Sequence, residues 1–474
     1  MHELNPRQRE AVRHLDGPLL VLAGAGSGKT RVITAKIAHL IEQAGVAARH
    51  ITAVTFTNKA AREMKERVGH LLGAEASRGL SISTFHTLGL TILRRELEAA
   101  GLRRGFTILD EQDVEQLLRE LGKRNEADRD TLQRARWRIS AWKNELIEPD
   151  AAIAQAEDDL DAYYAALYGA YQRALRAYNA VDFDDLILLP VKLLDTNPAL
   201  RERWQNRIRY LLVDEYQDTN GAQYALVRLL VGVRAALTVV GDDDQSIYAW
   251  RGARPENLAR LREDYPRLRV IKLEQNYRST GRILRAANTL IANNEHLFDK
   301  RLWSELGPGD PLRVITCRDE EDEADRVISE IIHQRFNSGA PYASFAILYR
   351  GNHQARPFEK ALRTQNIPYF LSGGTSFFAR SEIKDVMAYL RLIANPDDDS
   401  ALLRIINTPR REIGSNTLEA LAGYAAERGC NLFAAISELG LDQRLKPRPL
   451  SRLRELSAWL GELARSADSQ APVE

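Results

Sequence analysis

A glycine-rich segment near the start of the chain carries residue types that bind phosphate. Residues 23–30 read AGAGSGKT, which fits the phosphate-loop pattern G-x-x-x-x-G-K-[ST] except that alanine replaces the first glycine. Glycines let backbone N–H groups approach phosphate, the lysine would bind the β- and γ-phosphates, and the threonine would bind Mg²⁺. The alternative is a glycine-rich turn with a solvated lysine. The predicted nucleotide-binding residues here are Ala23, Gly24, Ala25, Gly26, Ser27, Gly28, Lys29, Thr30 and Arg31.

Two adjacent carboxylates follow a second apolar run. Residues 211–218 read LLVDEYQD, so Asp214 and Glu215 come directly after a short apolar segment. Asp214 would share the Mg²⁺ with Thr30, and Glu215 would polarise the attacking water, since the metal compensates the charge of neighbouring carboxylates. The alternative is an acidic strand end at the surface. The two motifs together predict nucleotide hydrolysis, but alone they do not separate it from phosphoryl transfer to a substrate hydroxyl.

Short apolar, β-branched runs must position these residues. Several of them end in polar residues, as buried parallel strands do, and helical stretches lie between them. This pattern predicts an α/β fold with ligands at the carboxyl ends of the strands. The predicted strands are 19–24, 51–57, 81–85, 210–216, 237–243 and 269–276, and later in the chain 311–316, 345–350 and 367–373. Residues 87–195 and the chain from 374 onward show helical periodicity instead.

Composition limits the class of protein. The chain has 474 residues, which predicts two to four domains. Its net charge of +1 means that any site for a polyanion must be a local patch. Cys317 and Cys430 are the only cysteines, so a disulfide framework is not expected. No apolar run has the length of a membrane span, and we expect a cytosolic protein without membrane contact.

Further motifs, in order along the chain, resemble one enzyme family. They are LNPRQREAV, AGAGSGKT, VTFTNKAAREMKERV, ISTFHTLG, LLVDEYQDTN, VVGDDDQSIYAWRGA, LEQNYRST and ILYRGNHQ. The chain resembles superfamily I DNA helicases of the Rep, UvrD and PcrA group, and most closely the Rep branch. This resemblance implies P-loop NTPase, RecA-like motor domains with parallel sheets and all-helical insertions. The implied domains are 1–86 with 196–277 (first motor), 87–195 (helical insertion), 278–373 (second motor) and 374–474 (second helical insertion).

The resemblance also implies roles around the nucleotide, with ATP and Mg²⁺ as cofactors. Gln8 would read the adenine edge and Tyr277 would stack on the ring. Gln245 would sense the γ-phosphate, and Arg278 would reach it from the second motor domain, a cation that couples hydrolysis to domain closure. For Arg278 taken alone, the alternative is a surface salt bridge. The implied catalytic residues are Lys29, Asp214, Glu215, Gln245 and Arg278.

DNA contacts are expected to rely on stacking, because a motor must ignore sequence and every base has a π-face. The residues implied by the resemblance are Phe56, Tyr248 and Trp250 for stacking, Asn58, Thr84, His86 and Arg251 for holding phosphates or ordering the aromatics, and Arg350, Asn352 and His353 in the second motor domain. For a lone aromatic, the alternative is a place in the core. The helical insertion adds basic residues that are interleaved with Trp137 and Trp142 and form either a DNA contact or a solvated face: Arg134, Arg136, Arg138 and Lys143.

The implied function is ATP-dependent 3′→5′ movement along single-stranded DNA with unwinding of duplex and fork DNA in replication. Replisome proteins are expected partners, and the oligomeric state, monomer or dimer on DNA, is left open. The alternatives are a UvrD-type repair helicase and an ATP-gated single-strand clamp without unwinding. Residues 374–474 lack recognisable forms of the family's later motifs, including a second catalytic arginine. We therefore expect a C-terminally truncated chain that binds nucleotide and DNA but hydrolyses ATP and unwinds weakly.

Overall fold

The computed structural model describes residues 4–122, 128–372 and 380–469, and it divides into two compact units. The first unit comprises residues 1–309 and 388–474, and the second comprises residues 310–387. These limits differ from the domain limits expected from the sequence at 277/278 and 373/374. Among the described residues, no helix combines the length and the apolar character that crossing a membrane would require.

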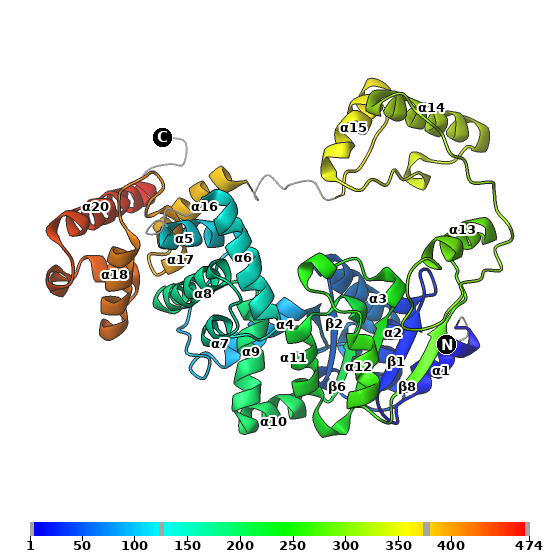
Figure 1. Cartoon of the computed structure of the whole chain (residues 1–474), viewed down its shortest axis with the longest axis horizontal. Coiled ribbons are helices and arrows are strands. Elements are labelled where there is room, and N and C mark those ends of the chain that lie inside the picture. Colours follow the sequence, from blue (N-terminus) through cyan, green and yellow to red (C-terminus); the bar gives the residue numbers. More distant parts are fainter. Residues whose placement is uncertain (1–3, 123–127, 373–379, 470–474) are drawn as a thin grey trace. The chain divides into compact units, whose positions relative to one another are not determined.

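A parallel sheet forms the centre of the first unit (Figure 1). Its strand order is β3-β2-β6-β7-β1-β8, and each neighbouring pair runs parallel. Four of its strands are buried at every residue, which explains their continuous apolar sequences. All six strands predicted for this part of the chain are confirmed, at β1 (Leu19–Ala23), β2 (Ile51–Thr55), β3 (Ser81–Thr84), β6 (Tyr210–Val213), β7 (Leu237–Gly241) and β8 (Arg269–Leu273).

Helices cover both faces of this sheet because successive residues of a strand point to opposite sides. In β1, Leu19 and Val21 pack into one apolar core while Leu20 and Leu22 pack into the other. The first core also takes residues from α1 (Pro6–Arg13), α2 (Lys29–Glu42) and α3 (Asn58–Ala76). The second takes residues from α4 (Phe85–Arg95), α9 (Asp185–Thr196), α10 (Pro198–Arg207), α11 (Gly221–Val231) and α12 (Asn257–Asp264), and α13 (Gly281–Ile291) follows β8.

Helical segments from two parts of the chain share a third core within the first unit. The earlier part is the predicted insertion, which also contains a two-residue parallel pair, β4 (Thr107–Ile108) with β5 (Ala180–Val181), that the sequence did not predict. A strand of two residues is too short to show an alternating apolar pattern in the sequence. The helices are α5 (Glu111–Gly122), α6 (Arg129–Asn144), α7 (Pro149–Ala154), α8 (Asp159–Ala177), α16 (Ser381–Ala394), α17 (Asp399–Ile405), α18 (Ser415–Arg428), α19 (Leu432–Ile436) and α20 (Pro447–Ser469).

The second unit packs α14 (Glu320–Ser338) against α15 (Ala355–Thr364) around a small apolar core. The structure assigns no strand to its described residues, so the predicted strands at 311–316, 345–350 and 367–372 are wrong; residue 373 lies outside the described residues. A strand exists only with a hydrogen-bonded neighbour. Val314 and Leu348 are instead 97% and 93% exposed.

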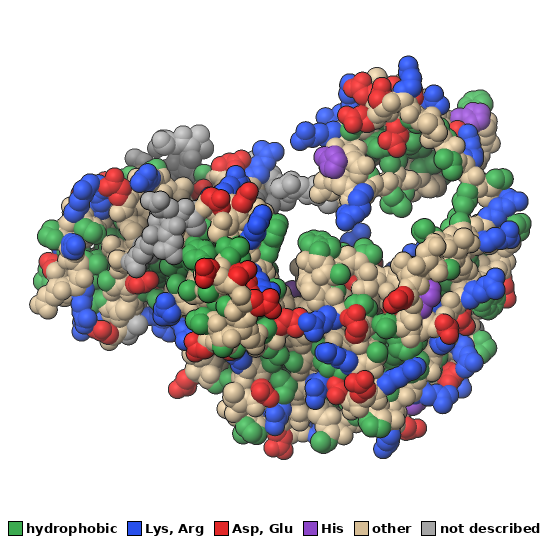
Figure 2. All heavy atoms as spheres, viewed as in Figure 1, with side chains coloured by type: hydrophobic (Ala, Val, Ile, Leu, Met, Phe, Trp, Pro, Cys, Tyr) green, Lys and Arg blue, Asp and Glu red, His purple; other side chains and the backbone are tan. Residues whose placement is uncertain are grey.

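Charges of both signs are mixed over the face drawn in Figure 2, in keeping with the net charge of +1. No large patch of positive or of negative side chains marks a site on that face. The candidate site must therefore be built from particular side chains.

Candidate functional site

The glycine-rich segment lies at the carboxyl end of β1 and leads directly into α2. Gly28 is the N-terminal cap residue of α2, and Gly26 and Gly28 have φ values of 67° and 88°, which favour glycine. A Cβ on Gly26 would lie 2.6 Å from Asn276 Nδ2, and one on Gly28 would lie 2.8 Å from Gln8 Nε2. The loop therefore requires glycine for both conformation and space. Its backbone and the N-terminus of α2 form an arrangement suited to an anion.

Three residues predicted to contact the nucleotide lie around this loop. Gln8 is buried, and its Nε2 donates to Ser27 O at 2.8 Å while its Oε1 accepts from Asn5 N at 3.0 Å. The Tyr277 N–H donates to Gly26 O at 2.9 Å, and the ring is 46% exposed. Arg278 is exposed, and within the described chain its guanidinium has no carboxylate partner, which disfavours the surface salt bridge. Adenine and γ-phosphate recognition by these residues stay predictions.

The lysine of the loop meets the acidic motif across 186 residues of sequence. Lys29 Nζ lies 2.7 Å from Glu215 Oε2 and donates to Gln245 Oε1 at 3.2 Å. Glu215 Oε2 also accepts from Gln217 Nε2 at 2.9 Å, and its backbone is left-handed, with a φ of 50°. The carboxyl ends of β1, β6 and β7 thus bring together one cation, one carboxylate and one amide, a set that fits a phosphate and an attacking water.

Asp214 is buried beside this group. Its N–H donates to Val54 O at 2.8 Å, and its Oδ1 accepts from the Glu215 N–H at 3.0 Å. Burial and then the charge of Glu215 raise the pKa of Asp214 to about 7, although Lys29 acts to lower it. A buried carboxylate that is costly to ionise alone gains from a nearby divalent cation, and carboxylate and hydroxyl oxygens are the ligands that Mg²⁺ prefers. The burial of Asp214 therefore fits a magnesium ligand, while the shared role of Thr30 stays a prediction.

An aromatic cluster lies next to the acidic motif at the same edge of the sheet. The rings of Phe56 and Tyr248 stack with centroids 5.2 Å apart, and Trp250 lies 6.2 Å from Tyr248. The Arg251 guanidinium covers both rings, at 5.3 Å from Tyr248 and 4.5 Å from Trp250. Trp250 is 68% exposed, so the core alternative fails for it. The cluster presents an aromatic surface and a cation, which suits a base and its phosphate.

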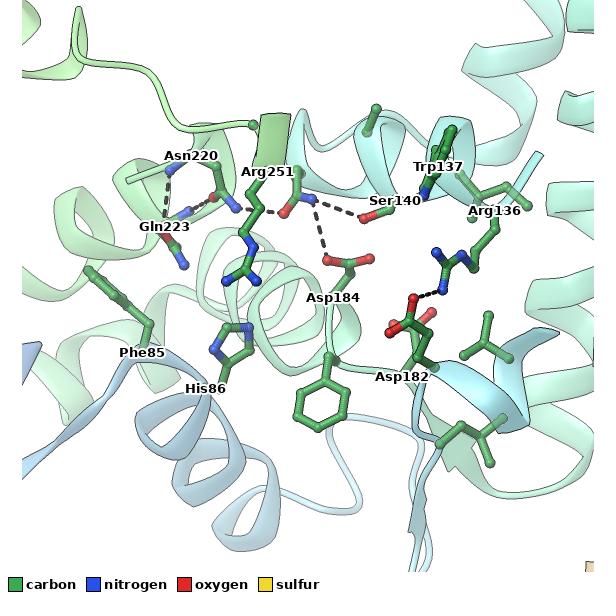
Figure 3. A pocket seen from close by; sticks show the side chains of 18 of the residues that line it. Phe85, His86, Arg136, Trp137, Ser140, Asp182, Asp184, Asn220, Gln223 and Arg251 are labelled. Atoms are coloured by element: carbon green, nitrogen blue, oxygen red, sulfur yellow. Dashed lines mark hydrogen bonds and ion pairs between the residues drawn. The ribbon is translucent and has the colours of Figure 1, made fainter. Parts of the chain in front are cut away.

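A cavity of about 790 Å³ continues from this cluster towards the helical insertion (Figure 3). His86 and Phe183 meet edge to face there at 6.0 Å, and burial lowers the pKa of His86. Contact of His86 with DNA stays a prediction. Asp184 accepts from Asn144 Nδ2 at 3.3 Å, and burial, with the charge of Asp182, raises the pKa of Asp184 to about 7.

The predicted DNA set omitted Phe183 and Trp137, although both line this cavity and are 52% and 58% exposed. A signal for Phe183 was its place between acidic residues in DFDD, where an aromatic side chain is not expected to be buried. Trp137 lay in a basic helical stretch that fitted a solvated face equally well.

The other predicted DNA residues have less direct placements. Thr84 is buried and caps α4, since its hydroxyl accepts from the Thr87 N–H at 3.2 Å. Asn58 is exposed at the first turn of α3. In the second unit, described by itself, exposed residues lie just before α15: Arg350, Asn352 and His353. DNA contact by these residues stays a prediction.

The four basic residues predicted on α6 differ in burial: Arg134 and Arg138 are exposed, Arg136 is half-buried and Lys143 is buried. Lys143 is fully buried and pairs with Asp182 and Asp185 at 2.6 and 2.8 Å, so both a DNA contact and a solvated face are wrong for it. Its partners lie 39 and 42 residues away in sequence, where helical periodicity gives no information. Arg136 pairs with Glu111, and Arg138 pairs with Asp161 at 2.7 Å.

Comparison with known proteins shows the family of this chain. Residues 4–266 match the family model of the UvrD/REP helicase N-terminal domain, and residues 271–443 match that of the UvrD-like helicase C-terminal domain. ATP-dependent DNA helicase Rep of Salmonella typhimurium is 59% identical over 98% of this chain and 69% of its own length. Rep of Escherichia coli is 58% identical over 98% and 70%, and PcrA of Staphylococcus epidermidis is 45% identical over 94% and 62%.

The match to the C-terminal domain extends to residue 443. The expectation of a truncated chain is therefore not supported. The absence of recognisable later motifs in residues 374–474 carries no conclusion about the activity of this chain.

Proposed function

This chain belongs to the UvrD/Rep helicase family, and we propose that it uses ATP and Mg²⁺ to move 3′→5′ along single-stranded DNA and to separate duplex DNA. One observation supports this most strongly. A single segment, residues 242–251, holds Gln245 on the phosphate-loop lysine and also Tyr248 and Trp250 in the aromatic cluster. A change at the nucleotide is thereby passed to the DNA-contacting rings through a few residues of backbone.

The contact between Lys29 and Glu215 suggests how ATP prepares the site. A γ-phosphate would attract Lys29 away from Glu215, since three phosphate oxygens offer more charge than one carboxylate. Glu215 would then be free to accept a proton from the attacking water, while Arg278 and Gln245 stabilise the charge on the transferred phosphoryl group. Mg²⁺, held by Thr30 and Asp214, would supply neutralisation of the phosphate charge.

Asp214 makes the demand for Mg²⁺ depend on pH. Its raised pKa of about 7 means that a proton competes with the metal below neutrality. The Mg²⁺ concentration for half-maximal ATP hydrolysis should rise roughly tenfold between about pH 8 and about pH 6. A magnesium titration of the ATPase rate at both pH values measures this. Equal Mg²⁺ requirements would show that Asp214 is already ionised at the lower pH, against this assignment.

Trp250 should contribute to DNA affinity by stacking. Stacking of one base on an aromatic side chain is worth about 1–3 kcal/mol, so Trp250→Ala should weaken oligo-dT binding between roughly fivefold and 150-fold. Fluorescence anisotropy of labelled oligo-dT measures the dissociation constant. Phe336→Ala is the matched control, because Phe336 is 88% exposed in the second unit and belongs to no proposed site. Equal affinity of Trp250→Ala and the control would remove Trp250 from the DNA site.

The identities to named relatives support a more specific proposal about the biological role. Rep of Salmonella typhimurium and Rep of Escherichia coli are 59% and 58% identical to this chain, against 45% for PcrA of Staphylococcus epidermidis. These identities favour a Rep-type role in replication, with replisome proteins as partners and a cytosolic location. A UvrD-type repair role is the alternative within the family.

ATP hydrolysis with and without oligo-dT tests the proposed function. We expect strong stimulation by oligo-dT, because residues 242–251 serve both sites. Binding of oligo-dT without any stimulated hydrolysis would contradict the motor and would favour the ATP-gated clamp.

A further inference from the structure

Lys300 lies next to the nucleotide site but belongs to none of the motifs described above. Its side chain is 4% exposed, and its Nζ lies 2.7 Å from Asp242 Oδ1 and 3.0 Å from Asp244 Oδ2, with Asp243 as a third partner. Burial alone would lower the pKa of Lys300, but the three carboxylates outweigh it and raise that pKa, so the ammonium stays charged. Removing one member of such a buried group leaves charge uncompensated, so the group resists rearrangement.

The carboxylates connect Lys300 to the phosphate loop. Asp242 accepts a hydrogen bond from Gln245 Nε2 as well as from Lys300. Because its Nε2 is taken by Asp242, Gln245 turns its Oε1 towards Lys29, whose Nζ donates to it at 3.2 Å. A continuous series of polar contacts therefore runs from Lys300 through Asp242 and Gln245 to the lysine expected to hold the γ-phosphate.

The segment that carries Lys300 also hydrogen-bonds to the stretch of chain between β8 and Arg278. The Trp303 N–H donates to Glu274 O at 3.1 Å, and the Asn276 N–H donates to Trp303 O at 2.7 Å. Two residues after Asn276 comes Arg278. On its other side the same segment is tied to Asp243, whose Oδ2 accepts from the Leu297 N–H at 3.0 Å. The segment thus contacts both the loop that holds Gln245 and the stretch of chain between β8 and Arg278.

We propose that Lys300 is a positioning residue for ATP hydrolysis. By fixing Asp242 it keeps the Gln245 amide on Lys29. This inference rests on the proposed function, because positioning matters only if the site hydrolyses ATP. The ion-pair partners of Lys300 are Asp242, Asp243 and Asp244, which lie outside the phosphate loop and the aromatic cluster, and this separates Lys300 from the catalytic residues.

Steady-state ATP hydrolysis at saturating oligo-dT tests the role. Lys300→Met should lower kcat by roughly tenfold to 100-fold with little change in KM, since small misplacements of catalytic groups cost about this much. Lys300→Arg should restore much of the loss. Lys65→Met, at an exposed position of α3, is the matched control and should behave as wild type. If Lys300→Met is too unstable to assay, adding Asp243→Asn removes one of the carboxylate charges that the substitution leaves without a partner. The double variant should then show the same loss of kcat.

Combination with Gln245→Ala separates positioning from a general structural effect. If Lys300 acts through Gln245, Lys300→Met should change the kcat of the Gln245→Ala enzyme by less than about twofold. A full multiplicative loss in that background, or an unchanged kcat in the single variant, would overturn the proposal.

Hydrogen exchange supplies a readout that does not need hydrolysis. The amides of Leu297 and Gln245 should exchange faster in Lys300→Met, because the carboxylate group that orders both loops is broken, while the amide of Val21 in β1 should be unchanged. Unchanged exchange at the two loop amides would refute the positioning role. If wild type shows no DNA-stimulated hydrolysis, the proposed function fails while this measurement still judges whether Lys300 orders the loops.

Discussion

Glu215→Gln is expected to lower the DNA-stimulated rate of ATP hydrolysis by roughly 10²- to 10⁴-fold, the contribution of a positioned general base. The amide keeps the shape of the side chain and can still accept from Lys29 and Gln217, whose donors lie 2.7 and 2.9 Å from Glu215 Oε2. Loss of rate would therefore report loss of proton acceptance. ATP binding should persist, because removing the carboxylate frees Lys29 for the phosphate.

Steady-state hydrolysis with oligo-dT, together with equilibrium binding of ATP, measures the two effects separately. Glu66→Gln is a matched control, since Glu66 is exposed on α3 and has no ion pair among the described residues. A Glu215→Gln enzyme that keeps nearly the wild-type rate would show that another group activates the water. Loss of ATP binding along with the rate would instead point to a structural role.

Lys143→Met is expected to have the largest effect on stability, about 3–5 kcal/mol in the free energy of unfolding, because it leaves two buried carboxylates without their cation. Lys143 is 0% exposed, and Asp182 also accepts from the Tyr171 hydroxyl at 2.9 Å. Burial acts to raise the pKa of Asp182, but Lys143 outweighs it and lowers that pKa in the native protein.

The pH dependence of this loss has a definite sign. Without Lys143 the pKa of Asp182 should rise, and a carboxyl whose folded pKa is raised costs stability as pH increases through that pKa. The difference from wild type should therefore be larger at about pH 8 than at about pH 5.5, measured by urea unfolding. Lys192→Met is the control, because it breaks a partly exposed ion pair with Glu148 and should cost under about 1 kcal/mol. A Lys143→Met loss no larger than that of the control would contradict this account.

Much of the first unit could be predicted from sequence because the relevant signals are local. Apolar runs that are buried on both faces specify a parallel sheet, and the polar residues that end them must then gather at one edge. That rule alone predicts that Lys29 and Glu215 lie near each other, and in the structure they are 2.7 Å apart. The helical periodicity seen after residue 374 is likewise local, and α16 there ends at Ala394, just before Pro396.

The features that sequence did not predict depend on partners far away in the chain. The run at 345–350 has the composition of a strand, but no hydrogen-bonded neighbour is assigned to it in the described part of the second unit. Lys143 has the pattern of a surface helix residue, yet it pairs with Asp182 in the turn before α9 and with Asp185 at the first residue of α9. The same turn carries Phe183 into the cavity, and only the packing of α6 against it reveals that position.

The measurement that tests the central claim most directly is strand displacement from a duplex with a single-stranded 3′ tail, compared with the same duplex carrying a 5′ tail. The account predicts ATP-dependent displacement of the 3′-tailed duplex alone, abolished by Glu215→Gln. ATP-dependent binding to both substrates with no displacement of either would contradict the helicase and would leave a single-strand clamp.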